Sequence, residues 1–302
     1  MNTLIFLLVL LCQSTGNQLD SDSIMQVGGL NRHEPIPPRK VDTAILRTWY
    51  EFTQMVNFDG VLLTASDTMV LVIGSNHSLY YDWNREEKYK NMIGQLDAAK
   101  KTTKEIIYKS INTFSELAVD HQRLSEFTPN RDNSEILKDR ENHIIITTDM
   151  DDADILHEQF YLLEENIPSQ NWYLSEDTLT VLGYTCYKAT CNFRGRDYIA
   201  WCALDIPLHD GPFKFYGLPG LILLLEDTEN LFQFRAIGLE QLSNVEIVSE
   251  SKNNFIKCTP EQYTRIKKKI RETLFLYYSR GISLYVTKRR LPIDYIPLAV
   301  EF

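Results

Sequence analysis

The sequence predicts an α+β protein: a curved antiparallel sheet, open or rolled into a half-barrel, with a long helix packed on it and a C-terminal helix. Three observations lead to this class. From residue 160 to residue 237, short runs of β-branched and aromatic residues alternate with turn residues. From about Arg85 to about Lys104, apolar residues recur at helical spacing. Thr259-Pro260-Glu261-Gln262 has the composition of a capped helix start.

Composition limits the classes of function. The chain has 302 residues, 44% of them hydrophobic, and a net charge of −10 from 31 basic and 41 acidic residues. A nucleic-acid binder would need a basic face, so nucleic acid is excluded as a partner. After the N-terminal segment, no apolar run approaches the roughly 18 residues of a membrane-spanning helix. The sequence therefore predicts no transmembrane segment in the mature chain.

The first residues are typical of an export signal. Leu4 to Leu11 is uninterrupted and apolar, and Ser14 and Gly16 are small residues suited to cleavage after Gly16. Lipidation at Cys12 is the alternative, although Leu11 does not suit it. We expect a signal peptide over 1–16, a flexible Pro-containing leader over 17–40, and a single domain over 41–302. The mature protein is then expected in the periplasm, at the outer membrane or outside the cell.

The N-terminal half of the domain is expected to supply strands. Residues 41–57 favour a strand over a helix. Residues 68–73 and 78–82 are predicted strands, and Gly74-Ser75-Asn76-His77 between them has hairpin-turn composition. Residues 127–142 are expected to form a loop and residues 144–148 a short strand.

The second half contains the predicted hairpins. Strands are expected over 160–165, 180–191 and 198–206, with a polar turn at Ser175-Glu176-Asp177. A turn at Gly195-Arg196 would join the last two of these strands. Strands that follow one another through short turns indicate an antiparallel sheet.

One stretch combines a tight turn with a buried strand. Pro219 and Gly220 predict a type II turn, in which Gly220 takes the positive φ. Gly217 would allow another part of the chain to come close. The apolar run from Leu221 to Leu225 then indicates a strand that is buried on both faces. The predicted motif consists of Gly217, Leu218, Pro219, Gly220, Leu221 and Ile222.

These six residues spell GLPGLI, and the sequence resembles the GLPGLI family, also called the Porph_ging family, of Bacteroidetes envelope proteins. Upstream stretches share that family's order and spacing: Trp172-Tyr173-Leu174, 183–189, 193–196, Ala200-Trp201 and Ile206-Pro207. The dense part of the resemblance runs from Trp172 to Phe234. It implies an exported protein, and it implies no reaction, because the family has no established biochemical function.

Four cysteines follow the export signal: Cys186, Cys191, Cys202 and Cys258. An even number of cysteines in an exported chain makes them disulfide candidates, with three complete pairings open. A turn at Gly195-Arg196 would place Cys191 opposite Ala200, with Cys202 one diagonal step away. Four separate buried thiols are the alternative.

The candidate binding residues are mostly aromatic. An aromatic-lined cavity in a curved sheet would suit an apolar ligand or an extended peptide, whereas the same rings would otherwise fill the core. Two arginines in the predicted hairpin turn could bind a carboxylate or a phosphate, or pair with acidic residues of the chain itself. The candidates are Trp172, Arg194, Arg196, Trp201, Phe213, Phe215 and Tyr216.

No catalytic residue, metal ligand or cofactor site is predicted. His209-Asp210 could in principle act as base and orienter, but adjacent residues of a strand point to opposite sides. The acidic residues from Asp149 to Asp154 do not fit a calcium loop, because the glycine and the final glutamate are missing. We therefore expect a non-catalytic envelope protein that binds an apolar ligand or a protein partner. A hydrolase of unrecognised type and a purely structural envelope protein are the alternatives.

Overall fold

The computed structural model describes residues 39–58, 61–84, 107–108, 134–149, 160–249, 255–265, 276–279, 282–285 and 293–294. Most of these residues form strands. The predicted signal peptide lies outside the described residues, as does the acidic stretch after Asp149. The strands are β1 (Arg39–Phe58), β2 (Val61–Gly74), β3 (His77–Asp82), β4 (Ile107–Tyr108), β5 (Glu135–Asp139), β6 (Ile144–Asp149), β7 (Phe160–Asn166), β8 (Tyr173–Val181), β9 (Tyr184–Phe193), β10 (Arg196–Ala203), β11 (Leu221–Asp227), β12 (Phe232–Ser249), β13 (Phe255–Cys258), β14 (Leu276–Ser279), β15 (Ile282–Tyr285) and β16 (Ile293–Asp294).

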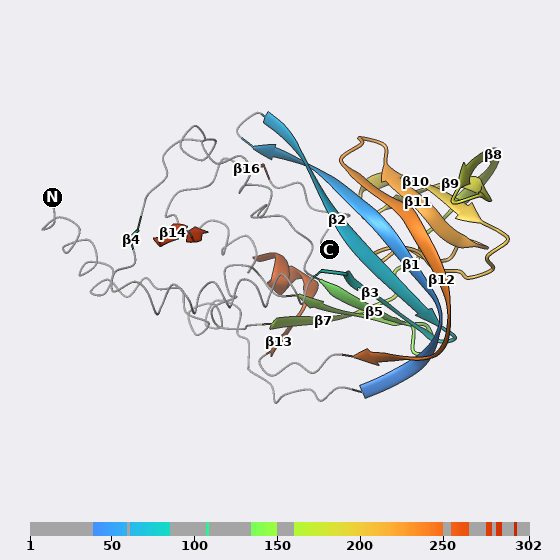
Figure 1. The fold of residues 1–302 in the computed structure, drawn as a ribbon, viewed down its shortest axis with the longest axis horizontal. Coiled ribbons are helices and arrows are strands. Elements are labelled where there is room, and N and C mark those ends of the chain that lie inside the picture. The colour runs from blue at the N-terminus through green and yellow to red at the C-terminus, as the bar shows by residue number, and fades with distance from the viewer. Residues whose placement is uncertain are drawn as a thin grey trace, which may run out of the picture.

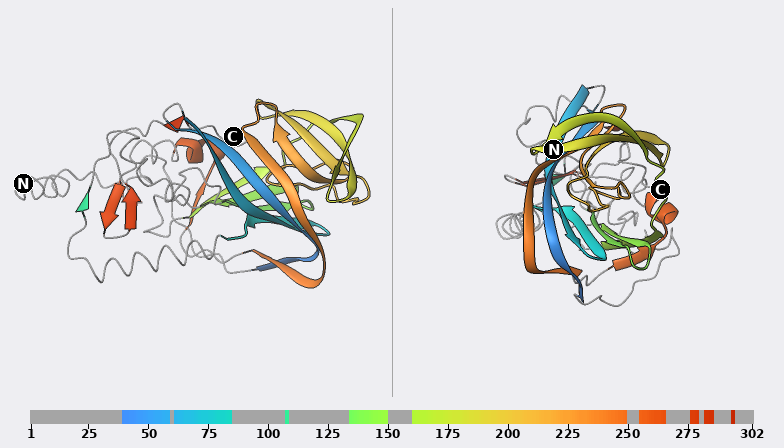
Figure 2. Two further views of the ribbon diagram at one scale, coloured as in Figure 1. Left: turned by 45° about the horizontal axis from the view of Figure 1, so that its top comes forward. Right: turned by 90° about the vertical axis from the view of Figure 1, so that its right-hand side faces the viewer.

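One large sheet dominates the molecule (Figure 1). Its strand order is β13-β7-β6-β5-β3-β2-β1-β12-β11-β10-β9-β8, and β16 adds to β1. The β13–β7 pair is parallel and the other pairs are antiparallel. A separate sheet has the order β15-β14-β4. Figure 2 shows the large sheet twisting and curling, and in the right-hand view its strands surround a common interior.

The predicted α+β class is wrong. In the described part of the chain the only helix covers residues 260–265, and no long helix packs on the sheet. The predicted helix from Arg85 to Lys104 lies outside the described residues. The apolar residues Ile266, Ile270, Leu274 and Tyr277 predict that the C-terminal helix continues to about Arg280, but residues 276–279 form β14. The start of that helix is confirmed: Gln262 N–H donates to Thr259 Oγ1 at 3.3 Å, and Thr259 N–H donates to Gln262 Oε1 at 2.8 Å.

The inner face of the curled sheet forms the main core, and most of the side chains that fill this core come from the strands themselves. Met69, Leu71 and Ile73 alternate along β2 and are fully buried. Phe52 of β1 stacks on Phe234 of β12, with ring centroids 4.6 Å apart. Residues of β1, β2, β3, β5, β6 and of the strands from β8 to β12 belong to the same buried cluster.

A second, smaller core lies on the other face of β2. Val70 and Val72, which alternate with the residues of the main core, are buried together with Ala44 of β1 and Ile247 of β12. The β1–β12 register shifts between Lys40 and Asp42 and between Ala44 and Leu46. Such irregularities bend strands, and Figure 1 shows the start of β1 and the end of β12 turning away together from the rest of the sheet.

Two predicted connections are strands. β5 lies inside the predicted loop 127–142, and all of its residues are buried although three of them are charged. Ser175-Glu176-Asp177, the predicted polar turn, belongs to β8. In both cases polar composition suggested a solvated turn. In β5 ion pairs and hydrogen bonds compensate the buried charges, and in β8 the strand is exposed.

The hairpin turns fix the register of β8, β9 and β10. Leu182-Gly183 and Arg194-Gly195 each have positive φ at both positions, which is the type I′ geometry of two-residue hairpins. The predicted turn at Gly195-Arg196 is therefore one residue too late. Cys191 lies opposite Tyr198 and not opposite Ala200, because moving a turn by one residue changes the pairing by two.

The GLPGLI stretch leads into the interior strand β11, as predicted, and five successive residues from Leu221 are fully or almost fully buried. The roles of its glycines are exchanged. Gly217 has the positive φ, +91°, and nothing lies within 4 Å of a Cβ placed there. A Cβ on Gly220 would meet the Ala203 carbonyl oxygen at 2.1 Å. Gly220 is thus required for a close approach of the chain to β10, and the predicted type II turn with positive φ at Gly220 is wrong.

Candidate functional site

A buried ammonium group holds the loop that precedes GLPGLI. Lys138 of β5 donates from Nζ to Asp210 Oδ1 at 2.5 Å, to the Gly211 carbonyl at 2.7 Å and to the Phe215 carbonyl at 3.1 Å. The three acceptors match the three N–H donors of an ammonium. Burial lowers the pKa of Lys138, and the neighbouring Asp210 carboxylate opposes that change.

Asp210 is equally occupied. Its Oδ2 accepts from Arg140 Nη1 at 2.5 Å, and its Oδ1 also accepts the N–H of Gly211 at 2.8 Å. His209 is exposed whereas Asp210 is buried. The two adjacent side chains therefore do not act as a pair, and the contacts of Asp210 give it a structural role.

The predicted aromatic residues separate into groups. Trp172, Phe215 and Tyr216 lie together: Trp172 Nε1 donates to the Tyr216 carbonyl at 2.9 Å, and the Trp172 and Phe215 rings are 6.3 Å apart. Phe213 packs elsewhere in the core, with its ring 6.3 Å from that of Tyr80. Phe213 and Phe215 are buried among other rings. These two residues therefore fill the core and do not line a cavity.

Trp201 is half-buried against the same main core, but within the described residues its ring makes no contact with the rings of Trp172 or Phe215. The Lys188 Nζ of β9 is 5.9 Å from the centre of its ring. The structure therefore does not bring Trp201 together with Trp172 and Phe215.

Both candidate arginines are paired within the chain. Arg194 contacts Glu165, which also accepts from Lys214. Arg196 Nη1 lies 2.5 Å from Asp227 Oδ2, and the Asp227 side chain is fully buried. Intramolecular pairing, the alternative to ligand binding, accounts for both guanidinium groups.

The four predicted disulfide candidates are free thiols in the structure, and all are buried. Burial raises the pKa of Cys186 to about 11 and the pKa of Cys191 and Cys258 to about 12. Burial also raises the pKa of Cys202. The arrangement is that of separate buried thiols.

β8 ends the large sheet and is exposed along most of its length. It pairs with β9 on one side, and no described strand pairs with its outer edge. Tyr173 and Leu174 at its start are 73% and 49% exposed, and Leu182 in the turn after it is 43% exposed. Large apolar side chains therefore stand at both ends of an open strand edge.

The type I′ turn determines which groups of β8 face that edge. Val181 and Tyr184 flank the two-residue turn and form a hydrogen-bonded pair, as do Leu179 and Cys186 two positions on. Thr180 lies between these pairs, so its N–H and C=O point away from β9. Thr178 occupies the equivalent position one step further along.

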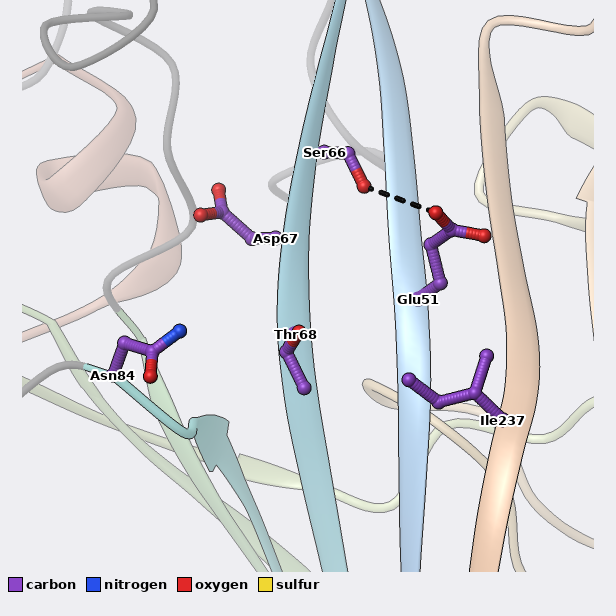
Figure 3. Close-up of a pocket in the computed structure, with 6 residues that line it drawn as sticks. All are labelled: Glu51, Ser66, Asp67, Thr68, Asn84 and Ile237. Carbon is purple, nitrogen blue, oxygen red and sulfur yellow. Dashed lines mark hydrogen bonds between the residues drawn. The ribbon is translucent and has the colours of Figure 1, made fainter.

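A pocket of about 240 Å³ lies on the central strands of the sheet, at the point where β3 ends and β2 continues (Figure 3). Figure 3 shows Glu51 of β1, Ser66 and Thr68 of β2 and Ile237 of β12 on one side, with Asp67 and Asn84 projecting on the other side of β2. Ser66 Oγ donates to Glu51 Oε1 at 3.5 Å.

Two tryptophans extend this surface. Trp83 precedes Asn84, and its backbone N–H donates to the Thr68 carbonyl at 3.0 Å. Trp83 is 48% exposed, and its ring lies 6.1 Å from that of Trp49, edge to face. The Arg47 guanidinium carbon lies 5.6 Å from the Trp49 ring centre and 6.0 Å from that of Trp83. A cation of the chain thus already occupies this aromatic surface.

Sequence reasoning missed three of these features: the buried Lys138–Asp210 pair, the open edge of β8, and the pocket. The composition around Lys138 predicts a loop, and the composition of Ser175-Glu176-Asp177 predicts a turn. The pocket residues come from three strands and a turn, and only strand register brings them together. Asp59-Gly60 is a dipeptide typical of a turn and lies midway between Glu51 and Asp67, and this spacing is the one signal in the sequence that the two residues could approach each other.

Comparison with known proteins agrees with the family that the motif indicated. A family model described as "Protein of unknown function (Porph_ging)" matches residues 194–224, which include the hairpin turn and all six residues of GLPGLI. No curated protein matches the chain. Within the described residues, no helix is long and apolar enough to cross a membrane.

Two solved structures are similar in part, titled "Structure of PNGF-II in P21 space group" and "Structure of PNGF-II in C2 space group". Each is 14% identical over 76% of this chain, with TM-scores of 0.43 and 0.44. The match spans only 35% of the length of either of those chains.

Proposed function

We propose that the protein is an exported envelope protein that binds a protein partner by adding a strand of that partner to the outer edge of β8. One observation carries the proposal: β8 ends the sheet, and its regular part, Thr178 to Val181, presents outward N–H and C=O groups at Thr178 and Thr180. Export is inferred from the N-terminal segment 1–16.

The composition of β8 supports a site limited to one half of the strand. The pairing with β9 is irregular between Leu174 and Thr178, and the intervening residues include Glu176 and Asp177. Irregular pairing and charge are the usual protection of an edge strand against unwanted pairing. Thr178-Leu179-Thr180-Val181 has neither feature, and this segment is therefore where we place the partner strand.

The exposed apolar side chains supply the second part of the argument. Main-chain hydrogen bonds give affinity with little sequence preference, whereas side-chain contacts give specificity. Tyr173, Leu174 and Leu182 stand at the two ends of the strand, where they would contact side chains of the partner. Binding of an apolar ligand in an aromatic-lined cavity has less support than binding of a protein partner, because Phe213 and Phe215 pack in the core.

The proposal is tested by capture from an envelope fraction with two variants of one residue. Thr180→Pro removes an outward N–H that makes no bond to β9, and Thr180→Val keeps this N–H while changing the side chain. Proline is tolerated on edge strands, so both variants are expected to fold. Unfolding midpoints and two-dimensional NMR spectra check folding before capture.

We expect wild type and Thr180→Val to retain the same partner and Thr180→Pro to lose it. Equal capture by Thr180→Pro would contradict strand addition. Absence of any saturable partner of the wild type would favour the purely structural alternative.

A further inference from the structure

We infer that the pocket beside the end of β3 binds an organic cation, an ammonium or guanidinium group carried on an aliphatic stem. The pocket is formed by Glu51, Ser66, Asp67, Thr68, Asn84 and Ile237. It is independent of β8, so the proposed function and this site can fail separately.

The charge of the lining is the first argument. Glu51 and Asp67 are the only charged residues among the six, and both are acidic. In the described part of the chain, the Glu51 carboxylate accepts one hydrogen bond, a long one of 3.5 Å from Ser66. Asp67 has a further interaction of its own, so the inference rests on Glu51. The cation nearest in register is Arg235, opposite Glu51 on β12, and it is exposed.

The size of the pocket selects a small occupant. Its volume of about 240 Å³ lies below the roughly 300–1,000 Å³ of sites that enclose drug-sized ligands. A single aliphatic chain with a charged head is of suitable size. The hydroxyls of Ser66 and Thr68 and the amide of Asn84 add hydrogen-bond partners around the head group.

The apolar part of the lining distinguishes an organic cation from a metal ion. Calcium requires about six to eight oxygen ligands around one point, whereas here the two carboxylates come from opposite sides of β2 (Figure 3). Ile237 is 48% exposed and offers an apolar surface that only an organic stem would use. Beside the pocket, the guanidinium of Arg47, which also pairs with Glu240, lies over the rings of Trp49 and Trp83, a cation–aromatic contact of the kind that an organic cation can make.

The test is a titration of the ¹⁵N-labelled protein with three matched probes. Cadaverine represents a free amine and N-acetyl-lysine methylamide represents a basic side chain of a protein. N-acetyl-lysine methylamide acetylated on Nζ is the neutral control. Backbone signals of Ser66, Thr68 and Asn84 report occupancy of the pocket. Glu51→Gln removes the charge at constant shape, and Glu246→Gln is the control, since Glu246 pairs with Lys40 on the same strand pair outside the pocket.

We expect saturable shifts with a cationic probe and none with the neutral one, and weaker binding at higher salt. Glu51→Gln should weaken binding about three- to fivefold, as expected for the loss of one exposed ion pair, while Glu246→Gln binds like wild type. The stronger of the two cationic probes identifies the source of the cation.

Equal binding of the neutral probe, unchanged affinity in Glu51→Gln, or no saturable shifts at millimolar probe would each overturn the inference. Saturation by calcium in preference to both amines would also overturn it, in favour of a metal ion.

Discussion

The ammonium of Lys138 and the carboxylate of Asp210 lie 2.5 Å apart, and their side chains are 2% and 1% exposed. Lys138 belongs to β5 and Asp210 to the loop before GLPGLI, so the pair joins two distant parts of the large sheet. Arg140 adds a second cation at 2.5 Å from Asp210. The loop is therefore fixed by charge at the point where the chain enters β11.

The first prediction concerns this pair. Asp210→Asn leaves the buried Lys138 ammonium without its counter-charge, and breaking a buried pair in this way costs about 3–5 kcal/mol. Urea unfolding measures the loss. The control is Asp177→Asn, which removes an exposed partner of Lys188 at 3.5 Å and should change stability by no more than about 0.5 kcal/mol. Similar losses of unfolding free energy in the two variants would show that the buried pair contributes no more to stability than an exposed pair does.

The second prediction ranks two glycines of the GLPGLI motif. Gly217→Ala meets no atom within 4 Å and has only to adopt a positive φ, at a cost of about 1–2 kcal/mol. Gly220→Ala places a methyl group 2.1 Å from the Ala203 carbonyl oxygen, so the backbone of β10 has to move. Chemical denaturation should show Gly220→Ala as the more destabilised variant. The reverse order would contradict the observed geometry and would favour the type II turn with positive φ at Gly220 that the sequence predicts.

The third prediction concerns acid stability. Burial raises the pKa of Asp42, but backbone hydrogen bonds from Asn76, His77 and Thr43 outweigh it and hold this pKa below its ordinary value. A carboxyl whose pKa is lower when folded stabilises the protein above its unfolded pKa, about 3.9, and this stabilisation is lost as pH falls through the folded pKa.

Unfolding midpoints measured from pH 6 to pH 2 test this dependence. Asp42→Asn should be less stable than wild type at pH 6, and the difference between the two proteins should shrink below about pH 4. A difference that stays constant over the whole range would mean that the charge of Asp42 contributes nothing.

The fourth prediction concerns the cysteines. Because burial raises the thiol pKa of Cys186 to about 11 and that of Cys191 to about 12, these groups hold little reactive thiolate at neutral pH. We expect iodoacetamide to leave Cys186, Cys191, Cys202 and Cys258 unmodified in the native protein and to modify all four in urea. Mass spectrometry after each treatment counts the added groups. A pair that resists modification in urea until it is reduced would be a disulfide.

The sequence was sufficient where composition and local chemistry coincide. Five successive apolar residues from Leu221 gave a buried strand, and Thr259 with Gln262 gave a capping box. It was insufficient where residues distant in the sequence determine whether a segment is buried. Lys138 lies in a buried strand because Asp210, more than 70 residues later, neutralises its charge.

The site depends on register, which composition does not fix. The sequence predicts the turn one residue later than its observed position at Arg194-Gly195, and the predicted residue opposite Cys191 is wrong as a result. The open edge of β8 follows from the strand order of the whole sheet. No local pattern in Ser175-Glu176-Asp177 could distinguish an exposed edge strand from a turn.

Amide hydrogen exchange at Thr178 and Thr180 tests the central claim most directly. Both N–H groups point away from β9, so they should exchange fast in the isolated protein, whereas Leu179, which bonds to β9, should exchange slowly. With the partner bound, we predict that exchange at Thr178 and Thr180 slows strongly while Leu179 stays unchanged. Fast exchange at both threonines in the saturated complex would show that the partner binds elsewhere.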